Sequence, residues 1–389
     1  MKRIAENADD IEFSIVLPCL NEAQTLGICI TKASNSLTTN NVKGEVIVAD
    51  NGSTDDSIKI AQSMGARVVK VSSPGYGNAL LGGFKASRGK YIIMADADDS
   101  YALDELTPFI IELRNGADLV MGNRFKGGIK PGAMPWLHKY LGIPVLSFLG
   151  RKFYKAKIGD FHCGLRGFNR IAILNLNLAG SGMEFASEMV VKATISDLKV
   201  VEVPTVLKPD GRSRKPHLRT WRDGWRHLVF LLVGSPKWLF LYPGITMSVV
   251  GAFGMILLSD GNLKFQGVSF DLNTFFFAEA LLVAGTETIF IAFIAQIFGE
   301  NYGILKKRDK YHFLYTKFTL ELELIFGFVF SIASIAVFLW RIATTSAYGP
   351  EGMNYEHSLR ITGLVTLLGI IGVQLLFSSF MATSIQSNI

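Results

Sequence analysis

Cysteine is scarce in this chain of 389 residues, which holds only Cys19, Cys29 and Cys163. Their spacing suits neither a disulfide framework nor a cysteine-based metal site, so we expect reduced thiols in a cytoplasmic domain. Charged residues are also few, at 19%, against 49% hydrophobic residues and a mean hydropathy of +0.31. This composition is unusually apolar for a soluble protein, and the apolar residues are concentrated in the C-terminal part.

The common glycine-rich phosphate-binding motifs are absent as well, because neither GxxxxGK[ST] nor GxGxxG occurs. Repeats and low-complexity stretches are missing, and we expect no nucleic-acid partner. The N-terminus, MKRIAENADD, has no apolar h-region, so we expect no cleavable signal peptide. Any nucleotide diphosphate bound by this chain is therefore predicted to be held by a metal ion and arginines.

Four long apolar runs follow residue 237. They are residues 238–258, 275–298, 324–340 and 361–382. About 20 apolar residues cross the hydrocarbon core of a bilayer, so we interpret the runs as four membrane spans. The third has 17 residues, which leaves little margin for tilt. The alternative is a soluble four-helix core.

Basic residues near these runs predict the orientation in the membrane. The loop 299–323 holds five of them, at positions 306, 307, 308, 310 and 317. The loops 259–274 and 341–360 hold one and two. We therefore expect a multi-pass protein of a bacterial or archaeal cell membrane, with both termini and the region 1–237 in the cytoplasm.

Short apolar segments alternate with helical segments over residues 12–215. The expected strands are EFSIVLPCL, EVIVAD, ARVVKVS and KYIIMAD. This order predicts an α/β domain with a mainly parallel sheet. Ligands of such sheets lie beyond the carboxyl ends of the strands. Three of these ends carry polar clusters, PCLNE, ADNGSTDD and DADDS, which we expect to meet at one edge.

Three acids, Asp96, Asp98 and Asp99, follow the fourth strand. A solvated turn would explain them, since Asp and Ser favour turns. The convergence of polar clusters favours a divalent-cation site instead, because Mg²⁺ and Mn²⁺ are often held by one or two carboxylates and by phosphate oxygens. Asp50 and Glu22 offer acceptors for ribose or base. The glycines of SPGYGNA, residues 73–79, would let the backbone approach a base closely.

Several segments, taken in order, resemble the family 2 glycosyltransferases. They are SIVLPCLNEAQTL, VIVADNGSTDDS, SPGYGNAL, YIIMADADDSY, VMGNRF, DFHCGLRGFNR and GRSRK. They are most similar to the branch that makes polyisoprenyl-phosphate sugars, such as dolichol-phosphate mannose synthases and bacterial undecaprenyl-phosphate glucosyltransferases. The resemblance implies a GT-A catalytic domain (1–215), followed by a juxtamembrane amphipathic segment (216–237) and an all-α transmembrane domain of four helices (238–389).

The resemblance also implies a site for the nucleotide sugar. Its binding residues would be Pro18, Asn21, Glu22, Asp50, Asn78 and Asp96. Asp96 and Asp98 would form the DxD pair that binds Mg²⁺ or Mn²⁺, with Asp98 the more direct ligand. Several relatives carry Gln where this chain has Ser100, which leaves the roles of Asp99 and Ser100 open.

The acceptor side is predicted from the segment DFHCGLRGFNR and from Arg124. By resemblance Asp160 lies near the acceptor, as a base or as an orienting group, and joins Asp98 and Arg124 as the expected catalytic residues. Arg124 and Arg166 are expected to hold phosphates, because a guanidinium binds phosphate bidentately. A surface or Asp-paired arginine is the alternative for each. His162 is expected to be structural.

The most basic segment is residues 206–227. It holds Lys208, Arg212, Arg214, Lys215, Arg219, Arg222 and Arg226 against Asp210 and Asp223, so seven minus two gives +5 of the formal net charge of +6. We expect Arg212, Arg214 and Lys215 to bind phosphate. Trp221 and Trp225 lie four residues apart, as in an interfacial helix. Simple positive flanking of a first span is the alternative.

These features predict an inverting, metal-dependent hexosyltransferase that uses a nucleotide sugar, with UDP-glucose the best guess, and a polyisoprenyl phosphate acceptor at the cytoplasmic membrane face. GDP-mannose and UDP-N-acetylhexosamine stay open as donors, and a homo-oligomer stays open as the assembly. A processive polysaccharide synthase is the second interpretation, although its QxxRW signature is missing. A non-enzymatic nucleotide-binding membrane protein is the third, and the intact DxD argues against it.

Overall fold

The computed structural model describes residues 11–212, 220–301, 305, 320–348 and 355–386. The chain divides into two compact units, Met1–Leu231 and Leu232–Ile389. This boundary lies inside the segment 216–237 that the sequence sets apart, because the first unit includes most of helix α9 (Thr220–Val233).

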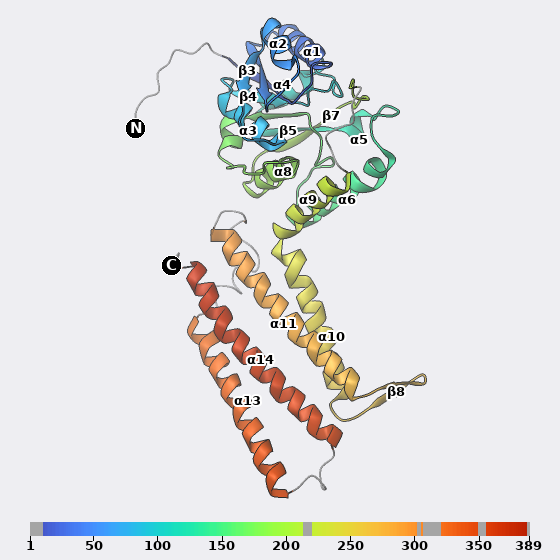
Figure 1. Ribbon diagram of the computed structural model, residues 1–389, viewed down its shortest axis with the longest axis vertical. Coiled ribbons are helices and arrows are strands. Elements are labelled where there is room, and N and C mark those ends of the chain that lie inside the picture. The colour runs from blue at the N-terminus through green and yellow to red at the C-terminus, as the bar shows by residue number, and fades with distance from the viewer. Residues whose placement is uncertain (1–10, 213–219, 302–304, 306–319, 349–354, 387–389) are drawn as a thin grey trace. The chain divides into compact units, whose positions relative to one another are not determined.

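A seven-stranded sheet in the order β3-β2-β1-β4-β6-β5-β7 forms the centre of the first unit (Figure 1). Its strands are β1 (Phe13–Cys19), β2 (Gly44–Asp50), β3 (Arg67–Lys70), β4 (Tyr91–Met94), β5 (Leu119–Asn123), β6 (Arg166–Asn169) and β7 (Val200–Pro204). Strand β6 runs antiparallel to β4 and β5, and the other pairs are parallel. The predicted mainly parallel sheet is confirmed, and the four expected strands are β1 to β4.

Helices cover both faces of this sheet. One core lies under α1 (Leu26–Thr39), α2 (Ser57–Ser63) and α4 (Thr107–Arg114). The other lies under α3 (Tyr76–Ala86), α7 (Arg170–Leu174) and α8 (Phe185–Ile195). Ile15 and Leu17 of β1 belong to the first core and Val16 to the second. This alternation follows from the opposite directions of successive side chains in a strand.

The strand register brings the predicted polar clusters together. In β1, Cys19 pairs with Asp50 at the end of β2, and Val16 pairs with Met94 at the end of β4. Since β1, β2 and β4 are parallel, their carboxyl ends lie at the same edge of the sheet. The residues that follow these three strands therefore surround one site.

The second unit is helical. Among the described residues, four helices are long and apolar enough to cross a membrane, over Lys237–Leu258, Leu272–Glu300, Glu321–Thr344 and Tyr355–Ile385. They correspond to η2 (Lys237–Leu241) with α10 (Tyr242–Leu258), α11 (Leu272–Asn301), α13 (Leu320–Tyr348) and α14 (Tyr355–Gln386). The four predicted spans are confirmed. The third span has 24 residues and is therefore not short.

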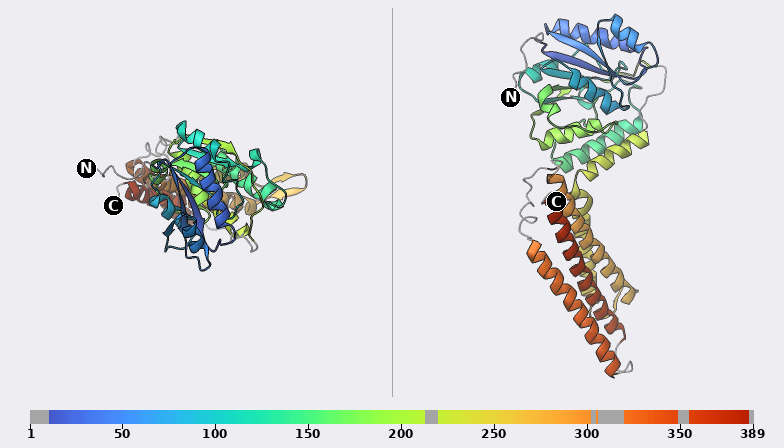
Figure 2. Two further views of the ribbon diagram at one scale, coloured as in Figure 1. Left: turned by 90° about the horizontal axis from the view of Figure 1, so that it is seen from above. Right: turned by 60° about the vertical axis from the view of Figure 1, so that its left-hand side comes forward.

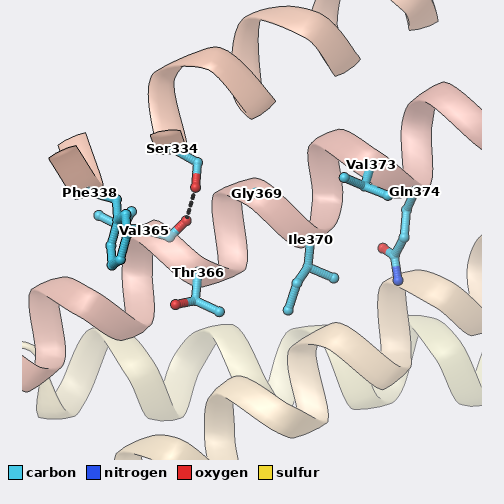
Figure 3. A pocket seen from close by; sticks show the side chains of 8 residues that line it. All are labelled: Ser334, Phe338, Val365, Thr366, Gly369, Ile370, Val373 and Gln374. Atoms are coloured by element: carbon cyan, nitrogen blue, oxygen red, sulfur yellow. Dashed lines mark hydrogen bonds between the residues drawn. The ribbon is translucent and has the colours of Figure 1, made fainter. Parts of the chain in front are cut away.

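Small residues allow these helices to approach each other. A Cβ at Gly251 of α10 would lie 2.5 Å from the backbone N of Leu282 in α11, and one at Gly372 of α14 would lie 2.6 Å from Oγ of Ser331 in α13. Such contacts are typical of helix packing in membranes. A groove of about 430 Å³ runs between α13 and α14, where the Ser334 hydroxyl donates to the Val365 carbonyl at 2.8 Å (Figure 3).

A short hairpin, β8 (Leu263–Phe265) with β9 (Val268–Phe270), connects α10 to α11. In the first unit, α5 (Arg124–Gly127) follows β5, and η1 (His138–Gly142) runs into α6 (Ile143–Tyr154). Both views show α6 alongside α9 (Figures 1 and 2). The Tyr154 hydroxyl donates to the Leu231 carbonyl at 2.9 Å and fixes this pairing.

Candidate active site

The three acids after β4 each have a different partner. The Tyr76 hydroxyl donates to Asp96 Oδ1 at 2.9 Å. Asp98 Oδ2 lies 2.5 Å from Nη2 of Arg212. Asp99 has a φ of 58° and pairs at 2.5 Å with Lys32 of α1. The structure thus separates Asp99 from the DxD pair, and it adds Tyr76, which the sequence did not single out.

Ser100 orients Asp98. Its backbone N–H and its hydroxyl both donate to Asp98 Oδ1, at 3.1 and 2.6 Å. Because Oδ2 faces Arg212, both carboxylate oxygens of Asp98 are occupied. Ser100, whose role the sequence left open, is thus used to fix the direction of Asp98.

Arg212 connects three acids. Besides Asp98, its guanidinium contacts Glu22 Oε1 at 3.1 Å and Asp210 Oδ2 at 3.2 Å. The segment that carries it is anchored to the DxD loop by the backbone, since Gly211 donates to the Asp98 carbonyl at 2.9 Å. The predicted phosphate ligand Arg212 is therefore at the DxD pair, next to the predicted donor residue Glu22.

Asp96 is poorly solvated. Burial, and then the neighbouring charge of Asp98, raises its pKa to about 6. Within the described residues no three His, Cys, Asp or Glu side chains converge as a metal cage. Two adjacent carboxylates nevertheless fit Mg²⁺ or Mn²⁺, because these ions take one or two protein carboxylates and complete their coordination with phosphate and water oxygens.

The other predicted donor residues shape the loops beside the site. Asp50 accepts hydrogen bonds from the N–H groups of Gly52 and Ser53, at 3.2 and 3.1 Å. Asn21, with a φ of 59°, accepts from Thr54 N–H at 2.7 Å. Their nucleotide contacts, like those of Pro18, which pairs with Ala49 at the end of β1, remain predictions.

The loop 73–79 is held by Asn51, which the sequence did not single out. The Asn51 amide donates to the Ser73 carbonyl at 2.8 Å and accepts from Gly75 N–H at 2.7 Å. A Cβ at Gly77 would lie 2.0 Å from the Gly180 carbonyl oxygen. Glycine is therefore required at 77 by the chain's own backbone, which is a different reason from the close approach to a base that we predicted. Asn78, predicted to lie near the base, donates to the Pro74 carbonyl at 3.0 Å.

Asp160 and Arg124 form a bidentate ion pair. The Nε–Oδ2 and Nη2–Oδ1 distances are 2.7 and 2.8 Å, and Asp160 is fully buried. The Asp-paired alternative that the sequence left open is therefore the one observed for Arg124. In this arrangement Asp160 orients the guanidinium, which is the second of the two roles predicted for it.

Arg166 binds backbone carbonyls. It is fully buried and donates to the carbonyls of Cys163, Ala186 and Phe161, at 2.9, 2.7 and 3.1 Å. All three side-chain nitrogens are used by the backbone, which argues against the predicted phosphate contact. Its role here is to attach the loop after Asp160 to α8.

The exposed face of α9 carries the predicted tryptophans and two arginines. Trp221 and Trp225 are 79% and 64% exposed, and Arg222 and Arg226 are exposed beside them. The opposite face is buried. This amphipathic pattern agrees with the predicted interfacial helix. The predicted phosphate ligands Arg214 and Lys215, and Arg219, lie outside the described residues.

A second exposed apolar face lies on η1, on α6 and on the residue Trp136 just before η1. It consists of Trp136, Tyr140, Leu141, Val145 and Phe148, with Trp136 71% exposed. Most of them lie three or four residues apart in the sequence, but this spacing resembles that of a helix that packs in the core. The first unit therefore has two strips of exposed aromatic and apolar side chains, one on α9 and one on η1 and α6.

Three polar side chains, two of them buried, join α9 to the loop of Asp160. Ser187 Oγ of α8 lies 3.2 Å from His162 Nε2 and 2.9 Å from His227 Nδ1. Burial lowers the pKa of His227 to about 4 and that of His162 well below its ordinary value. Both rings are therefore neutral at pH 7, which agrees with the structural role predicted for His162.

Comparison with known families decides the identity. The profile of glycosyl transferase family 2 matches residues 14–176, and the profile of the family 2 C-terminal transmembrane region matches residues 293–386. The chain is 34% identical over 380 residues to the low-salt glycan biosynthesis hexosyltransferase Agl6 of Haloferax volcanii, across 96% of this chain and 88% of that protein. The chain belongs to glycosyltransferase family 2.

Two further similarities have a narrower extent. The dolichol-phosphate mannosyltransferase of Pyrococcus furiosus is 26% identical to this chain over 264 residues. The match covers 65% of this chain and 72% of that protein. The crystal structure of glucosyl-3-phosphoglycerate synthase from Mycobacterium tuberculosis with Mn²⁺, UDP and its product is 22% identical, with a TM-score of 0.45, across 57% and 80% of the two chains. The matches to family 2, to its C-terminal transmembrane region and to the Haloferax hexosyltransferase confirm the predicted enzyme class and membrane character.

The Asp160–Arg124 pair leads to a first prediction. In Asp160→Asn, the buried charge of Arg124 loses its partner, which should lower the free energy of unfolding by about 3–5 kcal/mol. Because the guanidinium loses its orientation, kcat should fall by about 10²-fold or more, with nucleotide-sugar affinity nearly unchanged. Denaturant unfolding of the full chain in detergent and initial-rate kinetics measure both effects.

The control for this variant is Glu12→Gln, which breaks the exposed pair between Glu12 and Arg114. An exposed pair contributes about 0–1 kcal/mol, so stability and kcat should hardly change. A loss in Asp160→Asn that is confined to nucleotide-sugar affinity would contradict the assignment.

The histidine cluster leads to a second prediction. The unfolded chain takes up a proton at His227 near its ordinary pKa of about 6.5, well above the folded value of about 4. Stability from this group is thus fully present above about pH 6.5 and is lost as the pH falls toward 4. His227 alone should lower the free energy of unfolding by about 2 kcal/mol between pH 7 and pH 5.

Denaturant unfolding at both pH values, for the wild type and His227→Gln, measures this effect. The variant does not titrate at residue 227, so its stability should depend less on pH. An unchanged dependence would show that His227 is protonated equally in both states.

Proposed function

We propose that this glycosyltransferase transfers a hexose from a nucleotide sugar to a polyisoprenyl phosphate at the cytoplasmic face of the membrane, with inversion. The observation that carries the proposal is the DxD pair, Asp96 and Asp98, at the carboxyl edge of the sheet, with Arg212 beside it. The similarity to a hexosyltransferase over nearly the whole chain supports the hexose. The similarity to a dolichol-phosphate mannosyltransferase supports the lipid phosphate.

The donor is proposed to bind across the ends of β1, β2 and β4, with UDP-glucose as the first candidate. Asp50, Asn21 and Glu22 lie at these ends and would face base and ribose. Asp96 and Asp98 would hold Mg²⁺ or Mn²⁺, which supplies positive charge to the leaving diphosphate. Arg212, with Arg214 and Lys215 after it in the sequence, would add further positive charge there.

The chemical step needs little proton transfer. An oxygen of the acceptor phosphate forms a bond to the anomeric carbon while the bond from that carbon to the diphosphate oxygen breaks, and the nucleoside diphosphate leaves. The acceptor phosphate is already an anion at pH 7, so the site has mainly to align the reactants. Arg124, held by Asp160, is the side chain proposed to receive that phosphate.

The lipid acceptor is proposed to reach the site along a bilayer surface. The exposed tryptophans of α9 and the exposed face of η1 and α6 suit the interfacial layer, where aromatic side chains are favoured. In the sequence, α9 ends at Val233 and the first membrane span begins at Lys237. This connection supports a position of α9 close to the membrane.

A third prediction tests the proposed function directly. Purified enzyme is incubated with labelled UDP-glucose, GDP-mannose or UDP-N-acetylglucosamine, polyprenyl phosphate and Mg²⁺ or Mn²⁺, and lipid-soluble label is measured. One donor should give lipid-soluble product. EDTA and Asp98→Asn should abolish its formation, because EDTA removes the metal ion and Asp98→Asn removes a ligand that would hold it, so the diphosphate loses the positive charge that faces it.

The matched control is Asp99→Asn, since Asp99 pairs with Lys32 and lies outside the proposed metal site. It should retain most of the activity. Full activity in chelator would overturn the role of the DxD pair, and a water-soluble polymer as the only product would favour a processive synthase.

A fourth prediction concerns the membrane face. Arg222→Ala and Arg226→Ala should slow transfer in anionic liposomes, because each cation near an anionic surface contributes about 1 kcal/mol. High salt should mimic these changes in the wild type, since exposed charges are screened. With a short-chain acceptor in detergent the variants should match the wild type.

Arg212→Ala is the contrasting variant, because its guanidinium lies in the site. It should slow transfer with both acceptors, and salt should have little influence on the loss. Equal, salt-insensitive losses from Arg212, Arg222 and Arg226 would show that the exposed face of α9 does not bind the bilayer.

A further inference from the structure

Arg212 occupies the oxygen of Asp98 that a metal ion would need. Its Nη2 lies 2.5 Å from Asp98 Oδ2, while Asp98 Oδ1 accepts two hydrogen bonds from Ser100. The Arg212 side chain is only 12% exposed. A cation that takes Asp98 Oδ2 as a ligand therefore has to compete with the guanidinium for that oxygen.

The guanidinium is held by more than Asp98. Glu22 Oε1 lies 3.1 Å from Nη1, and Asp210 Oδ2 lies 3.2 Å from Nη2. The backbone positions the residue as well, because Lys208 N–H donates to the Ser100 carbonyl and Gly211 N–H to the Asp98 carbonyl, both at 2.9 Å. Displacing Arg212 thus breaks several charge-assisted hydrogen bonds, which are stronger than neutral ones.

A free divalent cation offers the guanidinium no new partner, since both are positively charged. A diphosphate does, because its oxygens accept the fork of an arginine as well as carboxylates do. Within the described residues the acids form no cage of three ligands, so the ion also depends on oxygens from outside the protein. Both observations make the entry of the metal depend on the donor.

We propose that Arg212 closes Asp98 to a free divalent cation, and that the cation enters together with the donor's diphosphate, to which Arg212 then transfers its hydrogen bonds. This inference rests on the proposed metal-dependent transfer but concerns the order of binding. Arg212 would then have two successive partners, Asp98 before the donor binds and the diphosphate afterwards.

The test measures metal binding in the absence of sugar and lipid. Mn²⁺ is titrated into the full chain in detergent at pH 8, and free Mn²⁺ is followed by electron paramagnetic resonance, with and without UDP or GDP. Wild type should bind Mn²⁺ weakly alone and tightly with the nucleotide. Arg212→Ala should bind Mn²⁺ alone about tenfold more tightly than wild type, the scale of one lost charge-assisted hydrogen bond.

Two controls locate the effect. Lys32→Met removes the cation from neighbouring Asp99 and should leave the affinity for Mn²⁺ alone unchanged. Asp98→Asn combined with Arg212→Ala should abolish the gain, because the ligand itself is lost. Arg212→Gln serves the same comparison where Arg212→Ala fails to fold.

Equal or weaker binding of Mn²⁺ by both Arg212 variants, or no binding by either, overturns the proposal. The titration contains no sugar and no acceptor, so its outcome is separate from that of the transfer assay. Another outcome is that the enzyme forms no lipid-linked sugar while Arg212→Ala still binds Mn²⁺ more tightly than wild type. That result would support the proposed binding order and reject only the proposed polyisoprenyl phosphate acceptor.

Discussion

Buried carboxylates at the carboxyl edge of the sheet are stable only because arginines neutralise them. Asp160 is fully buried and has its counter-charge in Arg124, and Asp98 has its counter-charge in Arg212. An unpaired charge in such surroundings costs several kcal/mol, so each acid keeps its arginine unless another cation takes its place. The loop after Asp160 and the segment 207–212 are consequently held against β4 and β5 by electrostatics as well as by backbone hydrogen bonds.

Much of the architecture could be predicted from the sequence. Apolar runs that end in polar clusters predicted four strands and their common edge, because strand order and connection rules leave few arrangements. Four apolar runs predicted four spans, but the third appeared short because its helix begins with Glu321 and Glu323, which interrupt the hydropathy signal and not the helix. Hydropathy measures solvation, whereas helix length depends on backbone hydrogen bonds.

The partners of the arginines could not be predicted in the same way. Arg124 and Arg166 both lie in motifs expected to bind phosphate, yet Arg166 meets the carbonyls of Phe161, Cys163 and Ala186. Those carbonyls come from segments whose proximity exists only in the folded chain. Likewise the apolar spacing on α6 resembled that of a core helix, although Phe148 is exposed. Periodicity identifies an apolar face without saying what covers it.

Residues 234–236 form the whole connection between α9 and the first membrane span, which begins at Lys237. An extended residue spans at most about 3.5 Å, so the C-terminal end of α9 stays within about 15 Å of that span. The enzyme and a substrate embedded in the same bilayer therefore meet by diffusion in the plane of the membrane. Its rate depends on the number of acceptor molecules per unit area of membrane, and dilution of the surrounding solution leaves that number unchanged.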